Sequence, residues 1–456
     1  MMLGRFPFVF LVLGALALPA GIARAAAADL PSPTAAELAQ LTLTRAEALF
    51  TERNRELQLA QRIVEGAEAD RISAGARPNP SLVLGPSGIT QRTPYGYSNN
   101  SWDRRFSSDV GLSQTFERGN KRELRIGAAD FNLQASRNES ADVVRQQRVA
   151  LAGAYYELVL AQERLRIAAD NAALYGKTMS AATLRQKAGD IAPSEVSRLN
   201  VDALRASNDA RAAQAGREKA QSALAYLLGI ERDARELRAV DPWPDPATPP
   251  AMPVLDAVLA GRADIAAAQA RVQAAEKNRE LARALRTRDV TVGAQFSHSP
   301  LDAYSNGIST NTWGLSIGVP LFLNYNYEGE IRRAEVDLQA ARDQLARVQA
   351  LATGDVQRAR ADLEAAADRA QRFRASLLAE ATRAADAAEF AYAKGAMGVM
   401  DLLDARRQLY AARLEAAATQ TDYAQALAAW RAAIAVTSVK PTEGDGAQPS
   451  RDVPAR

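Results

Sequence analysis

Residues 61–71 read QRIVEGAEADR, and residues 269–279 read QARVQAAEKNR. Five of the eleven letters are identical, and other matches follow in the same order along the chain. The offset between the two copies stays between 203 and 208 residues. Chance matches between alanine-rich helices would not keep one register across helix, strand and turn patterns, so the chain is one unit written twice. Further matching pairs are Gly111-Leu112-Ser113 with Gly314-Leu315-Ser316, and Gly189 and Glu195 with Gly395 and Asp401.

The composition excludes several classes of protein. The chain has 456 residues, 47% of them hydrophobic, with no Cys, a single His298, and 56 basic against 53 acidic residues. Without Cys there are no disulfides, thiol nucleophiles or thiolate metal sites, and one His cannot form a metal cage. The near balance of charges gives no support to nucleic-acid binding. We find no phosphate-binding loop or nucleophile elbow, so we predict neither an enzyme nor a cofactor.

The N-terminus has the pattern of a signal peptide over residues 1–25. Arg5 precedes an apolar run from Phe6 to Ala20, and Ala23-Arg24-Ala25 is a suitable cleavage site. An N-terminal membrane anchor is the alternative. Charges interrupt every later apolar stretch, so membrane insertion of the mature chain would have to use strands.

Each half of the chain shows the same order of elements. The box Thr44-x-x-Glu47 predicts the start of a helix that runs to about Ala76. The first repeat, 26–240, continues with strands at about 81–90 and 106–117, a long helix at 121–187 and a helix at 194–229. A proline-rich connector, 241–252, leads to the second repeat, 253–437. This repeat has a helix at 254–287, strands at about 289–298 and 312–322, a long helix at 326–394 and a helix at 400–436. The tail, 438–456, is predicted to be flexible.

The strands alternate apolar and small or polar residues, most clearly at 290–297 and 313–321. This is the pattern of a barrel strand between lipid and water, and aromatic residues near the strand ends suit a membrane interface. The alternative is a soluble hairpin packed on a small core. Four strands are too few to close a barrel, so several chains would have to contribute. The interface aromatics are Phe106, Phe116, Trp313 and Phe322.

The predicted helix lengths indicate a tall cylinder. Each long helix would measure about 100 Å at roughly 1.5 Å per residue. The two shorter helices of each half together match that length, so we expect them to stack end to end beside it. Alanine recurs at heptad spacing along the helices, which favours close packing against neighbours.

The whole mature chain resembles the TolC family of outer-membrane efflux ducts. The resemblance rests on the signal peptide, the duplicated halves, the Gly-x5-acid turns and the run from Asp401 to Tyr410. It implies a mainly helical fold with a membrane β-barrel portion: a trimer with a shared 12-stranded β-barrel, four strands from each chain, above a long periplasmic α-helical barrel. Arg77-Pro78-Asn79-Pro80 and Gly119-Asn120-Lys121-Arg122 are similar to its cobalt/zinc/cadmium-resistance branch.

The implied function is that of a passive exit duct in the cell outer membrane. Its partners would be a periplasmic adaptor (a membrane fusion protein), an inner-membrane pump of the RND type and outer-membrane lipid, and its cargo heavy-metal cations. Drug efflux or type I protein secretion through the same duct stays open, as does a periplasmic coiled-coil scaffold that does not enter the membrane.

The resemblance also assigns residues to the periplasmic end of the duct. Asp401 and Asp404 match the aspartates that ring the entrance, where threefold symmetry would gather six carboxylates. Glu195 and Tyr392 match a latch between neighbouring helices, but the latch arginine of the family falls on Met397, so we expect a weaker closed state. The turns that would dock the adaptor contain Gly189, Asp190, Pro193, Ser194, Gly395, Met397 and Gly398.

Overall fold

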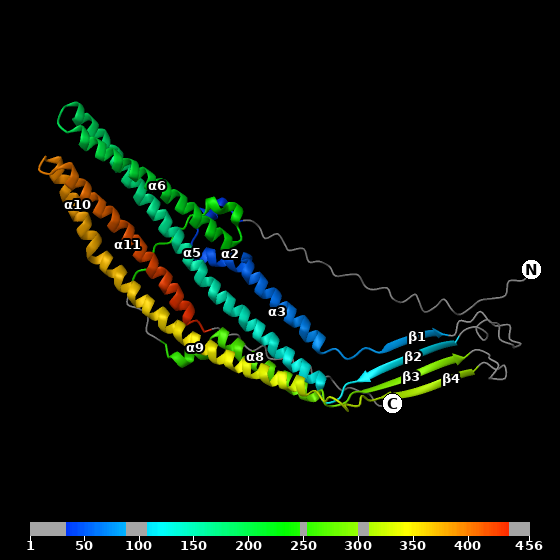
Figure 1. Cartoon of the computed structure of the whole chain (residues 1–456). Coiled ribbons are helices and arrows are strands. Elements are labelled where there is room, and N and C mark those ends of the chain that lie inside the picture. The colour runs from blue at the N-terminus through cyan, green and yellow to red at the C-terminus, as the bar shows by residue number, and fades with distance from the viewer. Residues whose placement is uncertain (1–32, 88–106, 247–252, 300–309, 437–456) are drawn as a thin grey trace, which may run out of the picture.

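The computed structural model describes residues 33–87, 107–246, 253–299 and 310–436 (Figure 1). The predicted signal peptide, the loops 88–106 and 300–309, Phe106 and the tail lie outside these ranges. Within them, no helix combines the length and apolar character that a membrane span requires.

The two repeats form matching series of elements. The first contains α1 (Ala35–Leu38), α2 (Leu43–Arg53), α3 (Arg55–Ala74), β1 (Ser81–Ser87), β2 (Ser107–Phe116), α5 (Lys121–Lys187), α6 (Pro193–Leu228) and the 3-10 helix η1 (Glu231–Glu236). The second contains α7 (Leu255–Ala260), α8 (Ala263–Ala284), β3 (Val290–Ser299), β4 (Thr310–Gly318), α9 (Glu328–Arg372), the π-helical turn η2 (Phe373–Leu377), α10 (Leu378–Ala393) and α11 (Val399–Ala433).

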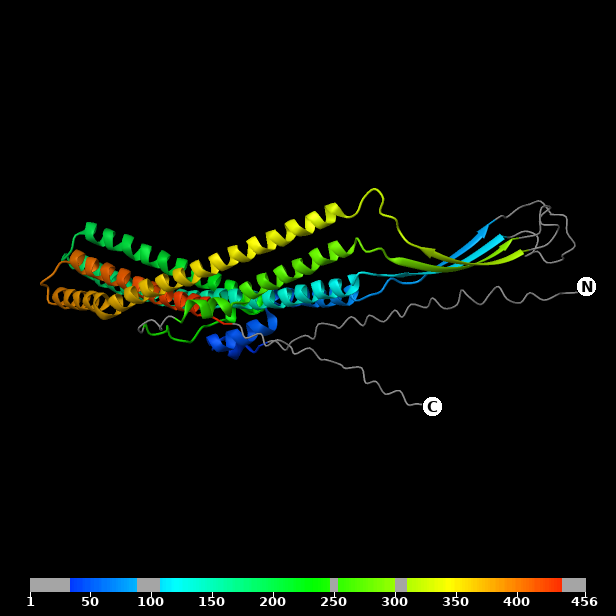
Figure 2. The same ribbon diagram turned by 90° about the horizontal axis from the view of Figure 1, so that it is seen from below.

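The helices form one elongated, curved layer, with the strands at one end and two helical hairpin turns at the other (Figures 1 and 2). α5 contacts α3 and α6 on one side and α8 and α11 on the other. The column of α9, η2 and α10 packs against α8 and α11. The shorter helices of each repeat therefore run in succession along a long helix. One layer of helices has a core between neighbouring helices but does not enclose a channel.

The first helix of each repeat is interrupted, which the sequence prediction missed. The predicted capping box at Thr44 is wrong, because Thr42 caps α2 by accepting a hydrogen bond of 3.2 Å from the Arg45 amide. The helix then breaks at Asn54, whose side chain caps α3. The second repeat breaks at the equivalent place, between α7 and α8 at Gly261 and Arg262.

Buried residues concentrate at mid-height, where these breaks occur. In the first repeat Phe50, Leu158 and Leu224 pack with α1 and η1. In the second repeat the equivalent positions are Val258, Leu363 and Trp430. A short parallel bridge between Leu41 and Ala239 ties the start of the first repeat to the end of that repeat. We call this level the waist.

The four strands form one antiparallel sheet in the order β1-β2-β3-β4. β2 pairs with β3, so the sheet joins the two repeats. β4 ends at Gly318, earlier than the predicted strand end at 322. β1 and β4 are the edge strands, and each has one row of backbone groups without a partner strand in this sheet.

Candidate functional site

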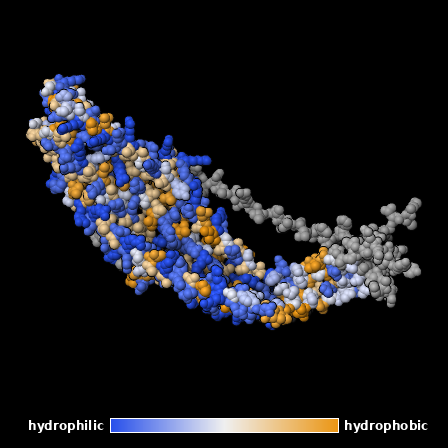
Figure 3. All heavy atoms as spheres, viewed as in Figure 1, coloured by the Kyte–Doolittle hydropathy of each residue, from blue (hydrophilic) through white to orange (hydrophobic). Residues whose placement is uncertain are grey.

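One face of the sheet is apolar from edge to edge. The register aligns Leu82, Leu112, Ala294 and Leu315 in one row across the four strands. A second row contains Leu84, Val110, Phe296 and Trp313. Leu315 is 89% exposed and Trp313 is 79% exposed, and patches of hydrophobic residues lie beside hydrophilic ones over the strands in Figure 3. On the opposite face β2, β3 and β4 have Ser, Gly and Gln at the intervening positions, with Val83 of β1 beside them, so the sheet has one apolar and one mainly polar face.

Three of the four predicted interface aromatics lie in the described residues. Phe116 is exposed at the end of β2, and Trp313 packs on Phe296 with ring centroids 4.9 Å apart. Phe322 follows β4, stands edge-on to Tyr327 at 5.1 Å and lies beneath the guanidinium of Arg288.

A polar network that the sequence reading did not predict joins the sheet to the helices. The Lys121 ammonium, in a residue only 6% exposed, donates to the Thr287 carbonyl and the Asp289 carboxylate, both at 2.8 Å. Arg125 binds both carboxylate oxygens of Glu117. This hydrogen bond is the main cause that lowers the pKa of Glu117 below its ordinary value. Lys121 belongs to the motif Gly119-Asn120-Lys121-Arg122, which the sequence analysis noted only as a family resemblance. Gly119 and Asn120 adopt positive φ there and turn the chain into α5.

The other end of the layer consists of two equivalent turns, which together we call the tip. Gly189 ends α5 with φ +85° and Gly395 ends α10 with φ +76°. In both turns the next residue donates its amide to the carbonyl five residues back, Asp190 to Arg185 and Ala396 to Ala391. These are Schellman motifs, which favour glycine at the left-handed position. Pro193 then opens α6 at its first turn, and Gly398 precedes α11.

The predicted entrance residues Asp401 and Asp404 and the predicted latch residue Glu195 follow these turns. Asp401 is in the first turn of α11, and Glu195 is in the first turn of α6. Asp401 and Asp404 are both exposed, and Asp404 accepts a hydrogen bond of 2.9 Å from Gln408. Leu402 and Leu403, between them, are buried. The buried pair therefore anchors α11 while the two carboxylates stay in solvent.

The two predicted latch residues do not bind each other in this chain. The Tyr392 hydroxyl instead accepts a hydrogen bond of 2.9 Å from Arg185, whose guanidinium also lies 5.4 Å from the centre of the tyrosine ring. Arg185 is on α5 and Tyr392 on α10, so this contact joins the two hairpins. Among the described residues, Glu195 has no side-chain hydrogen bond and Met397 is half-buried.

Two adjacent arginines on α11 make further contacts that the sequence reading missed. Arg406 binds the Glu389 carboxylate of α10 and donates to the Thr178 hydroxyl of α5 at 3.0 Å. Arg407 forms an ion pair with Asp202 of α6, which is 8% exposed. Burial alone would lower the pKa of Arg407, but the hydrogen bond and charge of Asp202 raise it above its ordinary value. Both arginines belong to the segment from Asp401 to Tyr410 on which the family resemblance rests, but the sequence did not indicate their partners.

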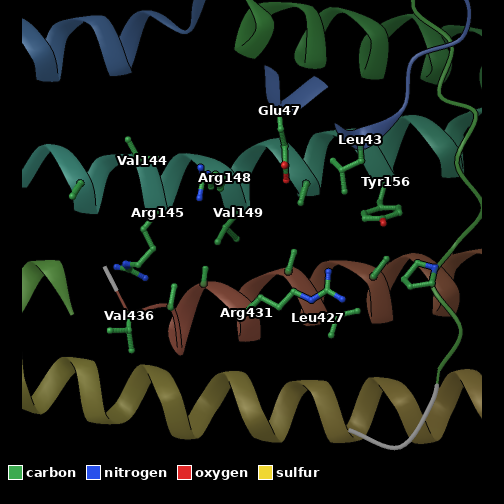
Figure 4. Close-up of a pocket in the computed structure, with 17 residues that line it drawn as sticks. Leu43, Glu47, Val144, Arg145, Arg148, Val149, Tyr156, Leu427, Arg431 and Val436 are labelled. Carbon is green, nitrogen blue, oxygen red and sulfur yellow. The ribbon is translucent and has the colours of Figure 1, made fainter. Parts of the chain in front are cut away.

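A cavity of about 550 Å³ lies at the waist between α2, α5 and α11 (Figure 4). Its walls combine alanine, leucine and valine side chains with Glu47, Arg145, Arg148 and Arg431. Arg145 is paired with Asp142 at 2.7 Å. No residue predicted for the site lines it. Across the described ranges, no three His, Asp or Glu side chains converge in the manner of a metal site.

The chain belongs to the outer membrane efflux protein family. The family model matches residues 48–230 and again residues 254–436, one match for each repeat. The protein is therefore an outer-membrane efflux channel of the kind that works in tripartite systems, with the TolC-like fold and a long periplasmic helical part.

Individual relatives are distant but match most of the chain. The cobalt-zinc-cadmium resistance protein CzcC of Cupriavidus metallidurans is 24% identical over 82% of this chain and 85% of its own. The pyoverdine export outer membrane protein OpmQ of Pseudomonas putida is 26% identical over 81% of both chains. The outer membrane channel CmeC of Campylobacter jejuni superposes with a TM-score of 0.72 at 16% identity, over 86% of this chain and 85% of that one.

Proposed function

We propose that three copies of this chain form a passive exit duct for heavy-metal cations, closed at its periplasmic end by Asp401 and Asp404. The observation that carries the proposal is the one-chain-thick layer with an apolar strand face at one end and exposed carboxylates at the other. A periplasmic adaptor at the turns of the tip and an RND-type pump in the inner membrane would deliver the cargo.

The two flanks of the helical layer support a closed ring of copies. The column of α3 and α6 packs on α5, and the column of α9 and α10 packs on α8 and α11, so each has a neighbouring helix column on one side only. Leu59 and Ile63 on α3 are exposed, as are Val336 and Leu351 on α9. The edge strands β1 and β4 each have one row of backbone groups without a partner strand in this sheet. Joining one flank to the other of the next copy buries both and extends the sheet, and three copies supply twelve strands, enough to close a barrel.

The entrance role of the aspartates predicts a change in cation block. In planar bilayers, Asp401→Ala/Asp404→Ala channels should need about tenfold more Co²⁺ for half-block, because six carboxylates leave the narrowest point. Single-channel recording measures this directly. Glu415→Ala, an exposed carboxylate further along α11, is the matched control. Equal Co²⁺ block in all three channels would overturn the entrance assignment while leaving the duct intact.

The metal cargo is supported by the relative CzcC, whose name states cobalt, zinc and cadmium resistance. OpmQ, at similar identity, is named for pyoverdine export, so cargo has to be tested in cells. A strain without this gene should stop growing at several-fold lower Co²⁺, Zn²⁺ and Cd²⁺ than its parent, and a plasmid copy should restore tolerance. Unchanged metal tolerance, with a conducting channel in bilayers, would remove the metal assignment and keep the duct.

A further inference from the structure

The ion pair between Asp202 and Arg407 links the two hairpins close to the tip. Asp202 lies on α6, in the first repeat, and Arg407 on α11, in the second. The carboxylate is almost fully buried, and its other cation, Arg205, is 3.8 Å away on the exposed side of the same helix. Around the pair, Tyr175, Leu199 and Leu403 form a small apolar cluster from α5, α6 and α11.

Neither member of the pair is repeated in the other half of the chain. With the offset of 206 residues that holds at the tip, the position of Asp202 is occupied by Gln408 in the second repeat, and the position of Arg407 by Val201 in the first. Each hairpin nevertheless closes with the same glycine turn. The pair therefore lies outside the repeated unit and joins one half to the other: its carboxylate is buried, and the Arg407 side chain is 48% exposed.

The position of the pair relates it to the entrance. Arg407 lies one turn of α11 beyond Asp404 and two turns beyond Asp401. Separating the α10–α11 hairpin from the α5–α6 hairpin would leave the buried Asp202 carboxylate without its close partner, which is costly in a site of low polarity. The pair therefore resists the separation of hairpins that would widen an entrance built from Asp401 and Asp404.

We propose that Asp202 and Arg407 are positioning residues that hold the carboxylates of the entrance in the narrow state. This inference rests on the proposed duct function. The ion pair would be a restraint more than two helical turns from the tip, made by charges from different repeats. It would act in a chain that has Met397 where the family resemblance places the latch arginine. Asp202 and Arg407 act through the position of α11 and need not touch the cargo.

Two single variants and one double variant test the proposal in bilayers. Asp202→Asn and Arg407→Gln should each raise the fraction of time in the wide conducting state at least about fivefold, the lower end of typical coupling between sites. Both should also weaken Co²⁺ block, because the carboxylates move apart. Arg413→Gln, an exposed arginine on the same helix with no ion pair among the described residues, should behave as the wild type.

The double variant separates positioning from stability. Asp202→Asn/Arg407→Gln removes both charges, so no buried charge is left unpaired and the midpoint of thermal unfolding should recover toward that of the wild type. Its conductance should nevertheless stay high, because this link between the hairpins is absent while the contacts of Arg185 with Tyr392 and of Arg406 with Thr178 are unchanged. If conductance returned to the wild-type value together with stability, the pair would be merely structural and the proposal overturned.

A crosslink supplies an independent readout, since the chain has no cysteine of its own. Asp202→Cys/Arg407→Cys should conduct like the double variant until a short cleavable thiol crosslinker joins the two sites. It should then return to the narrow state, and cleavage should reopen it. A conducting wild type with all variants unchanged would refute this inference alone, whereas a wild type that forms no channel would refute the proposed function.

Discussion

At the scale of single residues, the buried charges hold separate elements together. Arg262 is 1% exposed, binds both carboxylate oxygens of Asp264 and donates to the carbonyl of Ala433 at the end of α11. Burial by itself raises the pKa of Asp264, but the hydrogen bond and charge of Arg262 outweigh it, and the net pKa lies below its ordinary value. One guanidinium thus joins the start of α8 to the end of α11.

The lowered pKa values of Glu117 and Asp264 predict acid sensitivity. A carboxyl whose pKa is lower in the folded than in the unfolded state stabilises the fold above its unfolded pKa, and this contribution is lost as the pH falls through the folded value. The free energy of unfolding should therefore decrease steadily below about pH 4.5. Urea titrations of the detergent-solubilised protein between about pH 6 and pH 3 measure this.

Neutral variants should flatten that dependence. Glu117→Gln/Asp264→Asn should be less stable than the wild type at pH 6 and should lose less on acidification, since two of the responding groups are absent. Glu52→Gln, an exposed carboxyl on α2, should retain the slope of the wild type. An unchanged slope in the double variant would show that other carboxyls carry the acid response.

At the scale of elements, both helix breaks at the waist are stabilised by a side chain that donates to a carbonyl near the end of another helix, although the two side chains differ. Asn54 donates to the carbonyl of Leu227 near the end of α6, and Arg262 donates to Ala433 near the end of α11. In the first repeat this bond joins the start of α3 to the end of α6. In the second repeat it joins the start of α8 to the end of α11. The two polar residues occupy equivalent positions, 208 residues apart, so the helix break belongs to the repeated unit.

The prediction of single helices across these joints was wrong for a physical reason. The helical pattern continues through 45–76 without Pro or a glycine at the break, and the one local signal is Asn54, a residue type that favours helix caps. The Asn54 side chain donates a hydrogen bond to the backbone carbonyl of Leu227, and that partner is distant in sequence. The long helix α5, by contrast, has the predicted bounds of 121–187, because its glycine turns and its periodicity are local signals.

At the scale of the whole molecule, the exposed apolar flanks require further copies. Leu59 and Ile63 lie four residues apart on one face of α3, and they are 58% and 61% exposed. The proposed trimer covers them with the flank of the next copy. The stability of the channel is then linked to the concentration of its subunits.

Charges on this flank should therefore break the assembly. Leu59→Glu/Ile63→Glu should shift the detergent-solubilised protein from trimer toward monomer, because each added carboxylate would be buried without a partner. Light scattering coupled to size-exclusion chromatography reports the mass. Leu59→Val/Ile63→Val, which keeps the flank apolar, should remain trimeric. A trimeric double-Glu variant would place the contact between copies on a different surface.

The order of the elements, the duplication and the apolar strand face could all be predicted from residues close together in the chain. The placement of Asp401 and Asp404 after a glycine turn followed in the same way, since turns and periodicity are local properties. The partners of Tyr392, Asp202 and Lys121 could not be predicted, because they lie more than 160 residues away. Which arginine meets which carboxylate depends on how α5, α6 and α11 pack, and helix packing is set by side-chain shape across the whole layer. The order of the elements could therefore be predicted from local pattern, whereas the contact between Asp202 and Arg407, on which the proposed restraint rests, forms only when the two repeats pack side by side.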